Sequence, residues 1–487
     1  MKRQSGVLLP VFSLPGEYSC GSFGDEARAF VDMLAAGGFS VWQVLPFCLA
    51  DECSSPYKSY SAFSGNPYFI DLPDLRRRGL LTEEELLSAK QHTPYACEYE
   101  RLGRERLTLL ARAAERFSPW SAIEHFLDAH PATARFCEFM GRRSENGDRP
   151  WYEWQSDAVD RACERVWQFT QYIFFEQWQA LRAYANARGV RVIGDIPMYV
   201  ALDSADVWAE PEEFLLDARR RPTAVAGVPP DYFSADGQLW GNPLYNYAHM
   251  RKNGFAWWRR RMGAMAELFD GVRIDHFRAV DAYYSIPAGA ASAKEGTWCK
   301  GPGMPLLRAL REAAGDALLI AEDLGDITPS VRALLRRSGL PGMRVLQFAF
   351  LSDGASIHQP HLYENNCVAY TGTHDNNTLL GYMFEQSAQE RERLMTYIGH
   401  AGEEFNRPAI YRAVLRTLLM SAAGLTVVPL QDLLMYGADT RINTPGRAEG
   451  NWTYRVTREQ LEGLPLSELY AMNRRYGRTQ DSTPCDG

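Results

Sequence analysis

Short apolar runs alternate with longer amphipathic stretches along most of the chain. Several of the runs are almost entirely apolar, which is typical of strands that are buried on both faces of a parallel sheet. The stretches between them repeat apolar residues at helical spacing. The runs predict strands over Gly6–Val11, Val41–Pro46, Arg191–Pro197, Gly271–Asp275, Leu318–Asp323, Met343–Phe348, Cys367–Thr371 and Leu425–Leu430.

Two of the amphipathic stretches have clear boundaries. The pattern predicts a helix over Asp25–Ala36, with Asp25 as its N-cap and Gly37 directly after its last turn. A longer helix is predicted over Asp157–Arg188, and Gly189 is expected to end it. Both helices lie between predicted strands, as the crossover connections of a parallel sheet do.

This repeated alternation of strand and helix predicts an α/β protein with a (β/α)8 barrel, the TIM-barrel fold. We expect a single catalytic barrel over residues 1–487. Because the spacing between strands is uneven, we predict a mostly helical insertion over residues 73–170, after the second strand. A second insertion, over residues 201–262 after the third strand, is predicted to form a lid at the C-terminal face of the barrel. The polar segment after Arg474 is expected to be a mobile tail.

Carboxylate side chains follow four of the predicted strands. Asp195, Asp275 and Glu322 stand at the ends of the third, fourth and fifth strands, and Asp375 follows the seventh. The active sites of (β/α)8 barrels lie at the C-terminal ends of the strands. Because carboxylates at one mouth repel one another, such a cluster usually serves proton or glycosyl chemistry. Taken singly, an acid at a strand end is more often the N-cap of the next helix.

Asp275 and Glu322 lie on strands that are adjacent in chain order, and neighbouring strands are roughly 4.8 Å apart. Their carboxyl groups can therefore approach a separation of about 5–5.5 Å, which is typical of retaining glycoside hydrolysis. Inverting enzymes need a wider separation, about 6.5–9.5 Å. In the retaining reaction, one carboxylate attacks the anomeric carbon and the other protonates the leaving oxygen. Structural interpretations stay open for two neighbours, Arg273 as an ion-pair partner and His374 as a loop histidine.

The composition of the chain excludes some classes of binding partner and favours others. The net charge is −8, which argues against a nucleic-acid-binding protein, and 12% of the residues are aromatic, a supply of rings on which sugars can stack. Nine cysteines at scattered spacing predict reduced thiols in a cytoplasmic protein. The sequence predicts neither a secretory signal nor a membrane span, so we expect no nucleic-acid or membrane partner; the oligomeric state is left open.

Long motifs resemble one known family over nearly the whole chain. The GxRxD, AEDLG and THD motifs at Gly271–Asp275, Ala321–Gly325 and Thr373–Asp375 resemble signature regions of the α-amylase superfamily. Within that superfamily, the chain resembles the 4-α-glucanotransferases, also called amylomaltases or disproportionating enzymes. The motifs that carry this resemblance are SPYKSYSAFSGNPYFIDL (Ser55–Leu72), GVPPDYFSADGQLWGNPLY (Gly227–Tyr245), RIDHFR (Arg273–Arg278), GTWCKGPG (Gly296–Gly303), YTGTHDNNT (Tyr370–Thr378) and RINTPG (Arg441–Gly446).

The resemblance implies a role for each acid. Asp275 corresponds to the nucleophile that forms a glycosyl-enzyme intermediate, Glu322 to the general acid and base, and Asp375 to the acid that holds the distorted sugar ring. Arg273 is implied to orient Asp275 and keep it ionised. The implied substrate-binding residues are Arg273, His374, Asp195, Tyr57, Trp240, Tyr232, Phe233, His276 and Asn443, among which Tyr57, Tyr232, Phe233 and Trp240 would supply stacking and a lid, with the core of the insertion as the alternative for Phe233 and Trp240.

The resemblance also implies transfer of α-1,4-glucan segments from a maltooligosaccharide, starch-type or glycogen-type donor to a sugar acceptor, without a cofactor. No metal site is expected, because Val200 stands where the superfamily's first signature commonly ends in Asn-His. Asn377, Tyr382 and Ala279 also depart from the family pattern, which leaves the acceptor preference open. Two alternatives remain: an α-1,4-glucan hydrolase on the same scaffold, and a glucan-binding protein without catalysis. The second would be expected to lack one of the three carboxylates, and all three are present.

Overall fold

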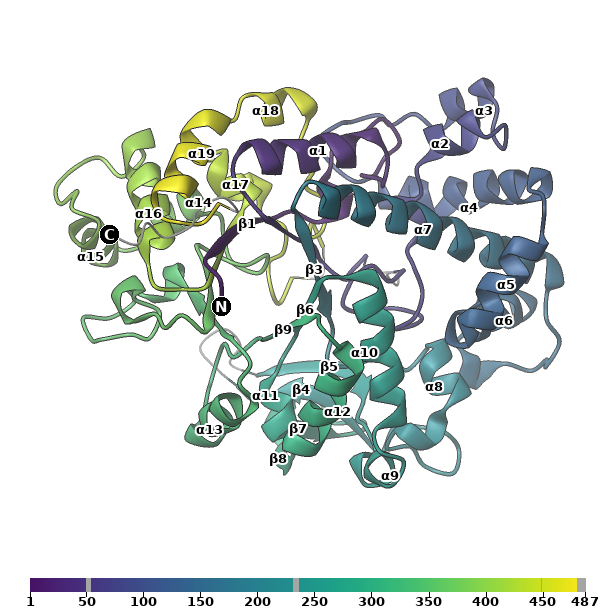
Figure 1. Cartoon of the computed structure of the whole chain (residues 1–487). Helices are drawn as coiled ribbons and strands as arrows, with labels where there is room; N and C mark the ends of the chain where they lie inside the picture. The colour runs from purple at the N-terminus through teal and green to yellow at the C-terminus, as the bar shows by residue number, and fades with distance from the viewer. Residues whose placement is uncertain (50–53, 231–235, 448, 480–487) are drawn as a thin grey trace.

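Eight parallel strands form a closed barrel at the centre of the molecule. The computed structural model describes the chain except for residues 50–53, 231–235, 448 and 480–487 (Figure 1). All eight predicted strands are present in the barrel, which confirms the predicted fold. They are β1 (Gln4–Leu8), β2 (Val41–Gln43), β3 (Arg191–Ile196), β6 (Gly271–Ile274), β9 (Leu318–Ala321), β10 (Gly342–Val345), β11 (Cys367–Tyr370) and β12 (Leu425–Pro429).

Barrel strands that follow one another in the chain are neighbours in space, and the first strand pairs with the last. The register of β1 and β12 runs from Gln4 opposite Leu425 to Leu8 opposite Pro429. Nearly every residue of the eight strands is buried, because the side chains of one face fill the barrel and those of the other pack beneath the surrounding helices. The first and last strands therefore close the barrel together.

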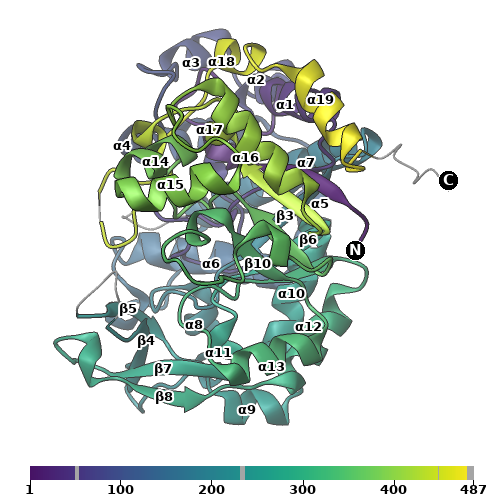
Figure 2. The same cartoon turned by 90° about the vertical axis from the view of Figure 1, so that its left-hand side faces the viewer.

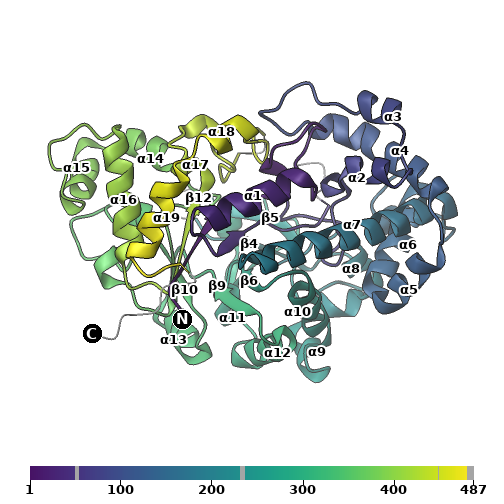
Figure 3. The ribbon, with the colours of Figure 1, turned by 45° about the horizontal axis from the view of Figure 1, so that its top comes forward.

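Helices surround the barrel (Figures 1 and 3). The predicted helix Asp25–Ala36 is present with the same bounds, as α1. Its N-cap is Gly24 and Asp25 already belongs to the first helical turn, so the prediction of Asp25 as the N-cap is wrong. The N-cap position has room only for a glycine, because a Cβ at Gly24 would collide with the Asp71 carboxylate. An acid in the first turn stabilises the N-terminus of the helix by its charge. Further helices around the barrel are α7 (Arg161–Ala187), α10 (Ala256–Leu268), α12 (Met304–Ala314), α13 (Pro329–Ser338), α16 (Pro408–Met420) and α19 (Leu466–Arg475).

The segment between β2 and β3 is mostly helical, and its later helices pack against α7 to form a lobe at one side of the barrel (Figure 1). The helix α7 begins after its N-cap Asp160, a few residues later than predicted, because the Asp160 side chain accepts the Cys163 N–H. The predicted bounds of this insertion, residues 73 and 170, fall inside α2 and α7. The helices of the lobe are α2 (Leu72–Arg77), α3 (Glu83–Ser88), α4 (Tyr99–Arg116), α5 (Ser121–Ala129) and α6 (Pro131–Glu145).

A second sheet, antiparallel, has the strand order β5-β4-β7-β8. Figure 2 shows β4, β7 and β8 together at one end of the molecule. The sequence pattern does not predict this sheet, because its short strands come from two segments of the chain, one after β3 and one after β6. The first segment continues into α10, so the predicted lid bound at residue 262 falls inside a helix. The two segments contain β4 (Ala224–Val228), β5 (Gln238–Pro243), β7 (Ala282–Pro287), β8 (Thr297–Lys300), α8 (Ala205–Ala209), α9 (Tyr247–Lys252) and α11 (Arg278–Asp281).

The C-terminal segment packs next to the seam between β1 and β12. Arg478 is buried, and its guanidinium donates to the carbonyl oxygens of Gln4 (2.8 Å) and Leu419 (2.6 Å). The prediction of a mobile tail after Arg474 is therefore wrong as far as Thr479, because these bonds tie the segment to the barrel; residues 480–487 lie outside the described part. No helix of the described chain is both long and apolar enough to cross a membrane. The remaining helices are α14 (Leu379–Glu385), α15 (Ala388–Tyr397), α17 (Leu430–Leu433) and α18 (Arg458–Glu462).

Candidate active site

The ends of β6 and β9 bring two of the predicted acids together. Ile274 and Ala321, the last residues of these strands, are paired in register. The next residue on each strand is Asp275 and Glu322, so the register places the two acids side by side on strands that are roughly 4.8 Å apart. The N-cap interpretation of the four acids is wrong, because other residues cap the helices that follow them: Ser204, Phe277, Thr328 and Thr378.

Arg273 lies between Asp195 and Asp275 at the base of the mouth. Its Nη1 is 2.7 Å from Asp195 Oδ2 and 2.9 Å from Asp275 Oδ1. The side chains of Arg273 and Asp195 are buried, whereas 28% of the Asp275 side chain is exposed. Asp195 also accepts a hydrogen bond from the Tyr57 hydroxyl (2.7 Å). Burial alone would lower the pKa of Arg273, but the two carboxylates raise it well above its ordinary value, so a full positive charge faces Asp275.

Glu322 lies in a different electrostatic setting. Its Oε2 accepts the His276 backbone N–H and its Oε1 accepts the Leu324 backbone N–H, each at 2.8 Å. The His276 backbone is left-handed, with φ of 47°. Burial raises the pKa of Glu322 to about 8; Arg273 and the Leu324 N–H oppose this rise, and the charge of Asp275 adds to it. Glu322 is therefore mostly protonated at neutral pH while it lies beside Asp275.

Asp375 lies in the loop between β11 and α14; we call residues 371–379, the last of which is the first residue of α14, the Asp375 loop. The neighbouring His374 has its Nε2 3.4 Å from Asp375 Oδ2. From a separate segment, Asn443 Nδ2 donates to Asp375 Oδ1 (2.6 Å), and Arg441 Nη2 donates to the Asp375 carbonyl oxygen (2.6 Å). The Asp375 side chain is 43% exposed, so it is accessible to a ligand even though one of its oxygens is held by Asn443.

Three aromatic rings pack together beside Asp375. Tyr57 stacks on His374 with 5.3 Å between ring centroids, and Trp452 lies 5.8 Å from Tyr57 and 6.0 Å from His374. Trp452 is buried and its backbone is left-handed, with φ of 65°, a strained conformation for a bulky residue. Trp452 supports two predicted site residues, yet the sequence does not single it out. Its one signal is that it follows shortly after the RINTPG motif.

The antiparallel sheet contributes Trp240, which packs edge-on against His276 with 5.1 Å between ring centroids. Burial lowers the pKa of His276 to about 4, so its ring is neutral at neutral pH. The His276 Nε2 has no hydrogen-bond partner in the described part of the molecule. Tyr232 and Phe233, the other predicted lid residues, lie outside the described residues.

The predicted residues that the structure describes form one connected site. Glu322 joins it through the His276 N–H and by its place beside Asp275. Within the described ranges, no group of three or more His, Cys, Asp or Glu side chains is arranged to hold a metal ion. Contacts run without a gap along Asp275, Arg273, Asp195, Tyr57, His374, Asp375 and Asn443.

Known proteins resemble this chain in sequence and fold over most of its length. The family model of the 4-alpha-glucanotransferases, glycoside hydrolase family 77, matches residues 9–461. The chain belongs to this family. Curated 4-alpha-glucanotransferases of Streptococcus pneumoniae and Thermus thermophilus are 41% and 42% identical to it, over 96% and 97% of this chain and 97% and 98% of theirs. The solved amylomaltase from Streptococcus agalactiae, in complex with acarbose, has a TM-score of 0.93 at 35% identity, covering 98% of this chain and 100% of that one.

Membership of the 4-α-glucanotransferases confirms the resemblance that the motifs carry. The chain is an enzyme of carbohydrate metabolism with 4-α-glucanotransferase activity. For a 4-α-glucanotransferase, the mouth of the barrel is the expected place of the reaction, and the acids described above lie there.

Proposed function

We propose that this 4-α-glucanotransferase works by a retaining double displacement in which Asp275 is the nucleophile and Glu322 is the general acid and base. The observation that carries the proposal is the contrast between two neighbouring carboxyl groups. Asp275 faces the buried guanidinium of Arg273 at 2.9 Å, and burial raises the pKa of Glu322 to about 8. A pair in which one carboxyl group faces a fixed cation and the other is kept protonated by burial is typical of glycosidic catalysis, with the first as nucleophile and the second as acid.

In the first half-reaction, a carboxylate oxygen of Asp275 attacks the anomeric carbon of the donor glucan. The bond from that carbon to the O4 oxygen of the next glucose breaks, and Glu322 gives its proton to this oxygen. The reducing-end part of the donor leaves, and the rest of the glucan is held as an ester on Asp275. Glu322 is now a carboxylate, which is stabilised by the His276 and Leu324 N–H groups at its two oxygens.

In the second half-reaction, the 4-hydroxyl of an acceptor sugar takes the place of the leaving group. Glu322 accepts the hydroxyl proton, the acceptor oxygen attacks the same carbon, and the ester bond to Asp275 breaks. Two inversions leave the α-1,4 configuration unchanged. The proposed donors are maltooligosaccharides and starch-type or glycogen-type glucans, and the proposed acceptors are sugars with a free 4-hydroxyl. Because the acid pair carries both steps, the proposal includes no cofactor.

The residues around Asp375 are proposed to bind the sugar at the reacting carbon. Asp375 is accessible and holds sugar hydroxyls as the ring distorts, while Tyr57 and His374 form a stacked wall beside it. Trp240 contacts His276 next to Asp275 and is proposed to cover the reacting carbon. A cover of this kind excludes water from the ester and so favours transfer over hydrolysis.

Asp195 and Asn443 are assigned a different role from the one that the motifs imply. The Asp195 carboxylate is fully buried and binds Arg273 and Tyr57. The Asn443 amide donates to Asp375. We therefore propose that Asp195 and Asn443 position the groups that touch the glucan. Arg273, also buried, acts in the same way through Asp275.

We further propose that the enzyme works in the cytoplasm, without a nucleic-acid or membrane partner. The described cysteines are free thiols: Cys20, Cys48, Cys97, Cys137, Cys163, Cys299 and Cys367. Reduced cysteines in this number are typical of a reducing compartment.

The covalent step can be tested with a donor whose leaving group needs no proton. With α-maltotriosyl fluoride, a Glu322→Gln variant should complete the first half-reaction but lack the base for the second, so the glucan ester accumulates. Mass spectrometry of the intact chain should show the added maltotriosyl mass, and peptide mapping should place it on Asp275. The same donor should label nothing in the Asp275→Asn/Glu322→Gln double variant. An adduct on another residue would contradict the nucleophile assignment.

Transfer is separated from the hydrolase alternative by incubation with maltotriose. Transfer should give glucose and a ladder of longer oligosaccharides while the number of reducing ends stays constant. A steady rise in reducing ends, without longer products, would identify a hydrolase.

A further inference from the structure

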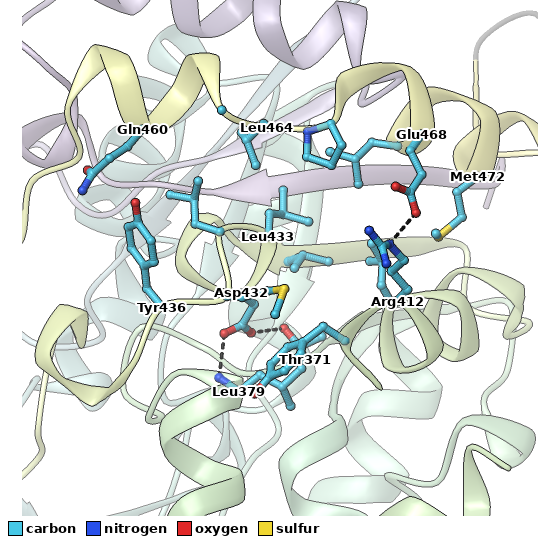
Figure 4. Close-up of a pocket in the computed structure, with 18 of the residues that line it drawn as sticks. Thr371, Leu379, Arg412, Asp432, Leu433, Tyr436, Gln460, Leu464, Glu468 and Met472 are labelled. Atoms are coloured by element: carbon cyan, nitrogen blue, oxygen red, sulfur yellow. Dashed lines mark hydrogen bonds and ion pairs between the residues drawn. The ribbon is translucent and has the colours of Figure 1, made fainter. Parts of the chain in front are cut away.

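One buried side chain fixes both ends of the Asp375 loop. Asp432 lies on α17, the short helix that follows β12. Its Oδ2 accepts the Thr371 hydroxyl at 2.5 Å, and its Oδ1 accepts the Leu379 backbone N–H at 2.6 Å. Figure 4 shows these two bonds leaving the Asp432 carboxylate. A single carboxylate therefore sets the distance between the points where the loop begins and ends.

The surroundings of Asp432 disfavour its charge. The residue is 6% exposed, and within the described chain no arginine, lysine or histidine forms an ion pair with it. Burial raises the pKa of Asp432 to about 6, and the two bonds to the loop oppose this rise. A buried carboxylate without a cation is stabilised only by hydrogen-bond donors. The two ends of the loop supply these donors, so the carboxylate and the loop ends hold one another in place.

A cavity borders the loop ends on the Asp432 side. Asp432 lines a cavity of about 460 Å³ between α16 and α17 on one side and α18 and α19 on the other (Figure 4). Much of the lining is apolar, for example Leu433 and Leu464, and the Tyr411 hydroxyl has no hydrogen-bond partner among the described residues. Side chains beside a cavity lose packing contacts, so on this side the two hydrogen bonds of Asp432 hold the loop ends, while Leu379 packs into a buried apolar cluster on the other side.

Other side chains hold the middle of the loop. Asn443 and Arg441 bind Asp375, and the Gln347 amide donates to the Asn377 carbonyl oxygen (2.8 Å). Asp432 binds the flanks of the loop, so it acts on Asp375 through the backbone.

We propose that Asp432 is a positioning residue for glucan transfer. By tying Thr371 to Leu379, it fixes where Asp375 and His374 stand relative to the reacting sugar. This rests on the proposed function, because it requires Asp375 to bind the distorted sugar ring. A misplacement of about 1 Å can lower an enzymatic rate by about 100-fold. Loss of one of the two bonds should therefore lower kcat by about 10- to 100-fold and change KM little, because the rest of the glucan-binding surface is intact.

Two variants weaken the bonds with little change of shape. Asp432→Asn leaves one accepting oxygen in place of two, and Thr371→Val removes the hydroxyl from a side chain of the same size. In maltotriose disproportionation, each should lower kcat by about 10-fold or more, with KM within about threefold of wild type. The double variant should lose less than the product of the two single losses, because both changes act on the same contact between these two side chains.

Asp71→Asn is a matched control. Asp71 is also buried with a pKa raised by burial, and it also accepts one hydroxyl, from Ser22 (2.9 Å), and one backbone N–H, from Asp74 (3.0 Å). It caps α2 in the helical lobe. If buried acids act on activity only through general stability, Asp71→Asn and Asp432→Asn should behave alike; we expect the control to keep kcat within about twofold of wild type.

The outcomes separate this inference from the proposed function. A kcat of Asp432→Asn equal to that of wild type or of Asp71→Asn would overturn the positioning role. If Asp432→Asn does not fold, Thr371→Val decides alone, and a wild-type kcat in that variant overturns the role. Transfer products from the wild-type enzyme with no effect in either variant would leave the proposed function standing and remove only the inference about Asp432. Hydrolysis in place of transfer by the wild-type enzyme would overturn the proposed function itself.

Discussion

The acid pair at the strand ends and the acid on the loop reach the same mouth by different structural means. Asp275 and Glu322 directly follow paired barrel strands, and the backbone N–H of each donates to a carbonyl oxygen of the neighbouring strand at 3.1 Å. The Asp375 N–H is bound within its own loop by the Thr373 hydroxyl (3.3 Å). The Asp375 carbonyl oxygen is bound by the Arg441 side chain.

This difference separates main-chain from side-chain positioning. At a strand end, the hydrogen-bond ladder of the barrel fixes an acid whatever the nearby side chains are. On a loop, the position depends on individual side chains, here Asn443, Arg441 and Asp432. Substitutions away from the acids should therefore disturb Asp375 more than they disturb the Asp275–Glu322 pair.

The largest effect is expected at the strand-end pair itself. Asp275→Asn should lower kcat for maltotriose transfer by roughly 10,000-fold, because the nucleophile of the first half-reaction is lost. Asp270→Asn is the control, since Asp270 directly precedes the same strand at the opposite end of the barrel, where it pairs with Arg182. Retained activity in Asp275→Asn, or an equal loss of kcat in both variants, would argue against a special role of the C-terminal strand end.

A smaller effect is expected for a side chain that holds the loop. Asn443→Ala removes the donor to Asp375 Oδ1 and should lower kcat by about 10- to 100-fold, because the carboxylate is free to rotate. Asn451→Ala is the control, since Asn451 binds Thr444 and Arg447 in the same segment and forms no hydrogen bond with Asp375 among the described residues. Timed assays with maltotriose measure the kcat of both variants. Equal losses of kcat would show that the effect comes from the whole segment and not from the bond to Asp375.

The pH dependence tests the electrostatic half of the comparison. Because Glu322 must carry a proton to protonate the leaving oxygen, kcat/KM should fall as the pH rises through the pKa of about 8, by roughly tenfold for each further pH unit. With α-maltosyl fluoride as donor, fluoride leaves without a proton, and this alkaline fall should be absent from the first half-reaction. A fall that is the same for both donors would assign the titration to another group.

The smallest effect on activity is expected at the barrel seam. Arg478→Met keeps an unbranched apolar stem but removes the donors to several carbonyl oxygens, which should cost roughly 3 kcal/mol of stability. The midpoint of thermal unfolding should fall, while kcat at 25 °C stays within about twofold of wild type. Arg474→Met, at an exposed position, should change neither. A large loss of kcat in Arg478→Met would mean that the seam positions the site.

The strand-end half of the site follows from sequence pattern because it depends on local order. An apolar run that ends in an acid places that acid at the mouth of a barrel, and this reasoning finds Asp195, Asp275 and Glu322 without a structure. The same pattern finds all eight barrel strands, although it extends several of them beyond the paired residues.

The part of the site around Asp375 depends on contacts between distant segments, and a local sequence pattern cannot predict such contacts. Asp432 follows a strand as the other acids do, but its role comes from Thr371 and Leu379 in another part of the chain. Trp452 supports Tyr57 and His374 from a third segment. The antiparallel sheet could not be predicted for the same reason, since its short strands come from two segments of the chain. In addition, the pairing of β4 with β5 has an irregular register.

The pairing of β1 with β12 has a consequence for the order of events during synthesis. The strand β1 is synthesised first but cannot complete its pairing until β12 is synthesised, since Gln4 pairs with Leu425. Until β12 is available, β1 and β11 each present an open strand edge, which invites pairing with other chains. A growing chain that already carries all three proposed catalytic acids therefore still lacks a closed mouth. The complete barrel mouth therefore requires β12 to pair with both β1 and β11.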